Sequence, residues 1–171
     1  ELVSRDTARI AKWGYELIKH DFTTIDTLSF HWEEDGNWHY YDRTITNATM
    51  LKRLYQTIQQ AAGDSVVIGC NTINHLVAGI HAAQRSSDTS GRYFEMTRRN
   101  GIASFIRLPQ NQSFFAIDPD CAAFTERVPI KENLDFLEVS AITGCITLAS
   151  VTSGILKGND LSRIREIYRV A

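Results

Sequence analysis

The sequence has no excess of basic residues, and this argues against a nucleic-acid partner. Its 18 lysines and arginines are outnumbered by 20 acidic residues, which gives a net charge of −2, whereas a nucleic-acid groove needs clustered positive charge. The sequence also lacks an apolar run long enough to cross a bilayer, and its first residues do not form a basic and then apolar signal segment. We therefore expect neither a nucleic-acid partner nor a membrane partner.

Cysteine and metal-binding patterns are sparse as well. The three cysteines, Cys70, Cys121 and Cys145, cannot all pair within the chain and lie in or just after strand-like segments, so we expect free thiols. The five histidines show no HExxH or other metal-ligand spacing. The sequence therefore predicts no disulfide framework, no metal ion and no other cofactor.

The composition itself is that of an ordinary globular protein, with 43% apolar and 22% charged residues. A chain of 171 residues has room for one sizeable core, so we expect a single domain over 1–171.

One local pattern recurs along the chain: an amphipathic helix, a glycine and an apolar strand. The expected helices cover 3–13, 46–62, 130–141 and a last segment capped by Asp160, with Leu161, Ile164, Ile167 and Tyr168 facing inward. The expected strands cover 15–21, 65–70, 114–117 and 145–150. The segment 78–84 fits either a helix or a strand, 91–100 fits a helix, and 102–108 stays open. This alternation predicts an α/β fold with a parallel sheet.

Polar residues follow the expected strands at the point where each strand ends. Lys19 and Asp21 alternate along the first strand, so both point to one side. A carboxylate beside an ammonium group stays ionised at neutral pH and can serve as a nucleophile. The corresponding residues of later segments are Cys70, Asn71, Arg85, Asp88, Asp118 and Asp120. In a parallel α/β protein they converge on one rim, where two carboxylates can perform glycoside hydrolysis. Taken singly, each of these is better explained as structural, a Lys–Asp ion pair in the first case, because structural aspartates at strand ends are common.

The order of these residues resembles that of the α-galactosidase (melibiase) clan of retaining glycoside hydrolases. The matching motifs are Lys19-His-Asp21-Phe, Gly69-Cys70-Asn, Arg85-Ser-Ser-Asp88 and Asp118-Pro-Asp-Cys121. The resemblance covers nearly the whole chain. It implies a (β/α)8 TIM barrel of which this chain spans about strands 4 to 8, the C-terminal half.

The resemblance also implies a role for each matching residue. Asp21 is expected to be the nucleophile and Asp88 the general acid/base of a retaining α-glycosidase, most simply an α-galactosidase-like enzyme. The residues expected to contact an α-linked oligosaccharide or glycoside are Lys19, Cys70, Asn71, Arg85 and Asp118. Because a nearby cation would lower the pKa of Asp88, we expect the Arg85 guanidinium to point away from that carboxyl.

Two features depart from the clan. Arg85 and Asp88 are three positions apart, where most relatives have four. Strands 1 to 3 are absent, and half a barrel leaves strand edges exposed. We therefore expect a missing N-terminal half or another subunit to complete the barrel, and the isolated chain to have little activity.

Two other interpretations stay open. The chain fits a non-catalytic carbohydrate-binding or structural module on the same scaffold. It also fits an open flavodoxin-like sheet that binds a phosphorylated ligand, for which 86–91 is the available phosphate loop.

The long connection 23–44 is a further open point. Its aromatic residues are expected either to stack on a sugar ring or to form a small core of their own, and Asp26 is expected to be part of the loop structure. These aromatic residues are Phe30, Trp32, Trp38, Tyr40 and Tyr41.

Overall fold

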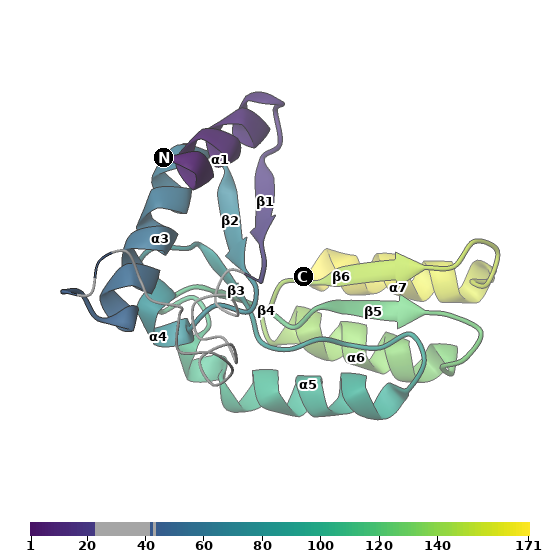
Figure 1. Cartoon of the computed structure of the whole chain (residues 1–171). Helices are drawn as coiled ribbons and strands as arrows, with labels where there is room; N and C mark the ends of the chain where they lie inside the picture. The colour runs from purple at the N-terminus through teal and green to yellow at the C-terminus, as the bar shows by residue number, and fades with distance from the viewer. Residues whose placement is uncertain (23–41, 43) are drawn as a thin grey trace, which may run out of the picture. The chain divides into compact units, whose positions relative to one another are not determined.

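The computed structural model describes residues 1–22, 42 and 44–171, and it divides the chain into two compact units, Glu1–Gln84 and Arg85–Ala171 (Figure 1). Each unit has its own helices and strands. The aromatic residues expected to meet a sugar, together with Asp26, lie outside the described residues. The expectation of one domain over 1–171 stays a prediction.

The first unit repeats the predicted helix and strand alternation. Its elements are α1 (Leu2–Lys12), β1 (Leu17–His20), α3 (Asn47–Ala62), β2 (Val66–Gly69), α4 (Asn74–Val77) and β3 (Ala83–Arg85), whose last residue begins the second unit. The strands are parallel in the order β1, β2, β3, with Leu17 opposite Val66 and Ile68 opposite Ala83. The open segment 78–84 therefore contains a strand. α3 begins where Thr46 accepts a hydrogen bond from Thr49 N at 3.2 Å, and Gly63 ends it with a φ of 61°.

One face of this small sheet is covered, whereas the other is exposed at the start of β1 and β2 and is buried again at Ile68. Ile18 of β1 and Val67 of β2 pack with Ile58 and Ala62 of α3. Side chains alternate along a strand, so the neighbouring residues face the opposite side. There Leu17 is 54% and Val66 41% exposed. This is the half-covered core expected of a barrel segment.

The second unit packs helices against a second pair of parallel strands. Its elements are α5 (Phe94–Ile106), the 3-10 helix η2 (Leu108–Gln110), β4 (Ala116–Asp118), β5 (Cys121–Phe124), α6 (Ile130–Ile142), β6 (Leu148–Val151) and α7 (Gly158–Val170). β5 and β6 pair in parallel, with Cys121 opposite Leu148. α6 lies against β5, α5 and α7 (Figure 1). The core is formed by Ala122, Phe124, Phe136, Leu137, Ala141 and Ile167.

Pairing resumes after Pro119, which the sequence did not predict. Asp118 ends β4 as expected, but β5 begins only three residues later. Asp120, between them, has a φ of 68°, which turns the chain before it pairs again. The segment before β6 also reaches β4, because Ile146 N donates to Ile117 O at 2.8 Å.

Two helices differ from the sequence pattern. α5 continues through Gly101 to Ile106, and a Cβ at Gly101 would lie 3.5 Å from the Phe136 ring, an ordinary packing distance. α7 begins at Gly158, so Asp160 lies in its first turn, where its carboxylate accepts from Lys157 N at 2.8 Å. The expected inward positions of Leu161 and Tyr168 are wrong, because both are exposed.

Candidate active site

The predicted site residues stand where strands end. Lys19 belongs to β1 and Asp21 directly follows it; Cys70 and Asn71 directly follow β2. Arg85 and Asp118 are the last residues of β3 and β4. Among the described residues, the backbone after three of these strand ends takes a left-handed conformation at non-glycine positions, namely Phe22, Asn71 and Asp120.

The Asp21 carboxylate is held by several donors within the first unit. Lys19 Nζ lies 3.2 Å from Oδ2, which confirms that Lys19 and Asp21 share a side. Oδ1 accepts from Asn71 Nδ2 at 2.6 Å and from Phe22 N at 2.8 Å. Burial raises the pKa of Asp21, but hydrogen bonds from Asn71, Lys19 and Cys70 and the charge of Lys19 outweigh it, so the pKa is lowered. The carboxylate is therefore ionised and oriented at neutral pH.

The backbone of β2 comes close to polar side chains next to this carboxylate. A Cβ on Gly69 would lie 2.5 Å from Gln84 Oε1, 2.6 Å from Thr72 Oγ1 and 2.9 Å from His81 Nδ1. Thr72 Oγ1 donates to Gln84 Oε1 at 2.7 Å, which ties the turn that carries Asn71 to β3. Only glycine leaves room for this arrangement at position 69. Cys70 beside it is buried.

In the second unit, the Arg85 guanidinium binds three carboxylates. Nε lies 2.7 Å from Asp118 Oδ2, and Nη1 lies 3.1 Å from Asp120 Oδ1 and 3.4 Å from Asp88 Oδ1. The expectation that the guanidinium points away from Asp88 is therefore wrong. It failed because Asp118 and Asp120 hold the guanidinium at the strand ends, where its Nη1 also reaches Asp88.

The three carboxylates differ in access to solvent. The Asp88 side chain is 70% exposed, whereas that of Asp118 is fully buried. Asp118 Oδ1 accepts from Asp120 N at 2.8 Å, so both of its oxygens are engaged. Burial raises the pKa of Asp120, but hydrogen bonds from the backbone of Thr89 and Cys121, the charge of Arg85 and the Thr89 hydroxyl together lower it.

The structure thus brings the predicted residues together in two groups. Lys19, Asp21, Cys70 and Asn71 lie in the first unit, and Arg85, Asp88 and Asp118 lie in the second. The separation of Asp21 from Asp88 stays a prediction, as do the roles given to all seven residues.

Two groups of buried or half-buried side chains near the site were missed by the sequence reasoning. His20, Tyr55 and His81 form a ring cluster with centroids 5.6–6.1 Å apart. In the second unit, α5 turns a polar face inward, formed by Thr97, Asn100 and Ser104, all buried. Their spacing of three and four residues is that of one helix face. The periodic spacing of these polar residues is the sequence signal that predicts a buried polar helix face.

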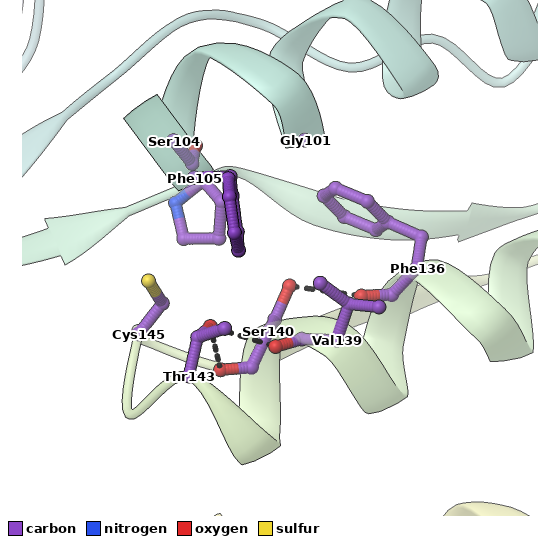
Figure 2. Close-up of a pocket in the computed structure, with 9 residues that line it drawn as sticks. Gly101, Ser104, Phe105, Phe136, Val139, Ser140, Thr143 and Cys145 are labelled. Carbon is purple, nitrogen blue, oxygen red and sulfur yellow. Dashed lines mark hydrogen bonds between the residues drawn. The ribbon is translucent and has the colours of Figure 1, made fainter. Parts of the chain in front are cut away.

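A small pocket between α5 and α6 does not involve any predicted site residue (Figure 2). It is lined by Phe105 of α5, by Phe136, Ser140 and Thr143 from α6 and its end, and by Cys145. The Ser140 and Thr143 hydroxyls donate to carbonyls of their own helix, those of Phe136 and Val139. Its inner space is about 10 Å³, which is at the limit of what one water molecule needs. It is therefore not a sugar site.

Within the part of the chain that the structure describes, no three or more histidine, cysteine or acidic side chains gather in a way that could hold a metal ion. No helix among those residues is both long and apolar enough to span a membrane.

Comparison with known proteins identifies the fold. No protein-family model and no curated protein sequence matches the chain. Its structure is similar to that of an α-galactosidase from Thermus thermophilus in complex with stachyose, with a TM-score of 0.68 and 15% identity over 96% of this chain. The same enzyme in complex with p-nitrophenyl α-D-galactopyranoside gives a TM-score of 0.63 and 13% identity, also over 96% of this chain.

The chain spans 36% and 34% of the length of these two structures. Both are TIM-barrel enzymes, so the comparison confirms the predicted α/β fold of the (β/α)8 type as a partial barrel. The predicted resemblance to α-galactosidases is confirmed at the level of fold.

Proposed function

We propose that the protein acts as a retaining α-glycosidase of the α-galactosidase type. The observation that carries the proposal is Asp21, a carboxylate at the end of a barrel strand that Lys19 and Asn71 keep ionised and oriented. A nucleophile needs both properties, since it must present a charged oxygen to the anomeric carbon. The solved enzyme with the similar fold was bound to stachyose, and this supports an α-galactoside as the substrate class.

In the proposed reaction, Asp21 attacks the anomeric carbon and the bond to the leaving oxygen breaks. Asp88 gives its proton to that oxygen and then takes a proton from the water that hydrolyses the glycosyl-enzyme. A retaining enzyme holds its two carboxyl groups about 5–5.5 Å apart, because no water has to fit between nucleophile and sugar. We expect Asp21 and Asp88 to approach that separation.

Three contacts in the second unit bear on the role proposed for Asp88. Asp88 is exposed enough for a leaving group to reach it. Arg85 lies beside it, but Asp118 and Asp120 bind the same guanidinium at 2.7 and 3.1 Å and share its charge. In this proposal Asp118 does not contact the sugar. It holds the Arg85 guanidinium in place. The residues proposed to contact sugar hydroxyls are Lys19, Asn71 and Arg85. The buried Cys70 instead forms a hydrogen bond to Asp21, which lowers the pKa of that carboxylate.

The test uses the protein with a complete barrel and compares three variants. Asp21→Asn should abolish turnover while sugar binding persists, because the amide keeps the shape and loses the charge. Asp88→Asn should slow substrates with poor leaving groups far more than activated aryl glycosides, since only the former need protonation. Azide should restore turnover of the Asp88 variant and give an α-glycosyl azide. Asp64→Asn, an exposed carboxylate in the turn before β2, is the control and should leave activity unchanged.

A product of inverted configuration, or an Asp21→Asn variant that still turns over, would refute the proposal. The partial length of the match favours one alternative, a carbohydrate-binding module that shares the scaffold without catalysis. That alternative predicts calorimetric binding of an α-galactoside with no hydrolysis, even when the barrel is complete.

A further inference from the structure

The inward face of α5 is polar although it is buried. Thr97, Asn100 and Ser104 are at most 4% exposed. A buried polar group is costly unless it is hydrogen-bonded. A helix needs an apolar stripe to pack, so polar residues at these positions weaken the packing that holds α5 in place. The hydrogen-bond partners of these three residues therefore indicate which part of the structure the polar face holds.

Asn100 bonds two segments that follow different strands. Its Nδ2 donates to Ser87 O at 3.1 Å and also to Pro119 O, while its Oδ1 accepts from Ser86 Oγ at 2.8 Å. Ser86 and Ser87 follow β3, and Pro119 follows β4. One amide thus joins the two turns and uses both of its donor hydrogens.

The ends of β3 and β4 and the turns after them carry the candidate site residues of the second unit. Arg85 is the last residue of β3, and Asp88 lies in the turn that follows it. Asp118 is the last residue of β4, and Asp120 lies in the turn that follows it. The two strand ends and their turns also bond each other next to Asn100, because Thr89 N donates to Asp120 Oδ2 at 2.9 Å and Ser86 N donates to Asp118 O at 2.9 Å.

We propose that Asn100 is a positioning residue that holds the turn with Asp88 at a fixed distance from the end of β4 at Asp118 and the turn with Asp120. Its action on catalysis rests on the proposed function, in which Asp88 is the general acid/base. Without the amide, the carbonyls of Ser87 and Pro119 lose their donor at the buried end of the turns, and the turns separate. Asp88 then leaves the place from which it can protonate the leaving oxygen.

The chain offers a matched control for this residue. Asn133 of α6 is also buried in the second unit, and its Nδ2 donates to Ala123 O in β5 at 2.9 Å. It bonds the middle of a strand, away from the two turns. Replacing either asparagine by leucine removes one buried side-chain amide and keeps a similar side-chain volume. A general loss of stability should therefore appear in both variants.

The experiment compares Asn100→Leu with Asn133→Leu in the 171-residue chain by NMR. Asn100→Leu should make the Thr89 amide exchange with solvent about tenfold faster, the effect of losing one hydrogen bond, and should raise the pKa of Asp120. Asn133→Leu should change neither. Equal effects of the two variants, or no effect at Thr89 and Asp120 in Asn100→Leu, would overturn the proposal.

Two additions keep the test decisive. If Asn100→Leu does not fold, Ser86→Ala replaces it, because it removes the hydroxyl that Asn100 Oδ1 accepts from and should move the same signals by a smaller amount. In the enzyme with a complete barrel, Asn100→Leu should lower kcat for poor leaving groups more than for activated ones, whereas Asn133→Leu should not discriminate. If the NMR signals respond but the parent protein hydrolyses no α-galactoside, the proposed function fails and the positioning role stands.

Discussion

The hydrogen bond from Asn71 to Asp21 makes the charge of one residue depend on the side chain of another. It joins the turn after β2 to the end of β1 at 2.6 Å. We predict that Asn71→Ala raises the pKa of Asp21, because a donor to the charged form is lost. A carboxyl-carbon NMR titration measures this directly. In an active enzyme, the acid limb of kcat/KM should move to higher pH. Asn74→Ala, at the start of α4, is the control, and an unchanged Asp21 titration in Asn71→Ala would contradict the prediction.

His81 makes the first unit sensitive to acid. Burial and then the neighbouring His20 lower the pKa of His81 from 6.5 to about 4, although the Tyr55 backbone opposes them. The unfolded chain therefore binds more protons than the folded chain between these values. Stability is present above pH 6.5 and is lost as the pH falls towards 4. The full difference corresponds to roughly 3 kcal/mol as an upper bound.

His81→Leu should flatten this part of the stability profile, which urea unfolding at several pH values between 7 and 4 would measure. Burial also lowers the pKa of His20, against the charge of Asp21, so some slope should persist in the variant. An identical slope in parent and variant would show that His81 does not titrate in this range.

At the scale of whole elements, Gly69 sets how closely β2 and β3 approach. A Cβ there would lie within 3 Å of Gln84, Thr72 and His81. Gly69→Ala should therefore destabilise the chain by about 1–3 kcal/mol, the usual cost of overpacking. It should also disturb Asn71, whose turn Thr72 holds. Gly158→Ala is a suitable control, because nothing lies within 4 Å of its Cβ position at the start of α7. Chemical denaturation measures the free energy of unfolding of both variants. Equal values for Gly69→Ala and Gly158→Ala would contradict the prediction.

The elements that could be predicted from sequence are those in which regularly spaced apolar residues are followed by a glycine or by charged residues that end the helix or strand. β1, β2 and α3 were found in this way, and so was the position of Asp21 after β1. β5 was missed, because a proline predicts the end of pairing and cannot tell that pairing resumes after a turn. Asn100 was missed for another reason: a polar residue in a helix looks solvent-exposed until its partners, which are distant in sequence, are known.

The contacts of Arg85 show the same limit within the site. Its strand-end position followed from the sequence, but its three carboxylate partners come from two turns that only the fold brings together. Ion pairs of this kind depend on tertiary distances of a few ångströms, which residue spacing does not specify.

The whole chain presents apolar surface on the uncovered sides of its strands. Leu17 and Val66 in the first unit, and Leu148 and Val151 in the second, are 39–54% exposed. We predict that the purified 171-residue chain self-associates and has little or no hydrolase activity, because exposed strand edges and apolar faces favour pairing with other chains. Light scattering after size exclusion should show species heavier than the monomer.

A charge on the exposed face should weaken this association. Leu17→Lys should lower the association constant about tenfold or more, since burying one leucine stabilises a contact by roughly 1.5–3 kcal/mol. Leu2→Lys changes a leucine on α1 that is also exposed, at 66%, and is the control. A monomeric chain with full activity on an aryl α-galactoside would show the prediction to be wrong.

The left-handed residues after the strand ends have a consequence for heat resistance. Phe22 has a φ of 63°, which costs a residue with a bulky side chain roughly 1–2 kcal/mol that glycine does not incur. Part of this gain is offset by the greater freedom of glycine in the unfolded chain. Phe22→Gly should therefore raise the melting temperature by a few degrees. The same change makes the backbone at position 22 more flexible, and the N–H of this residue donates to the Asp21 carboxylate. We therefore expect Phe22→Gly to be more stable to heat but to catalyse more slowly than the parent protein.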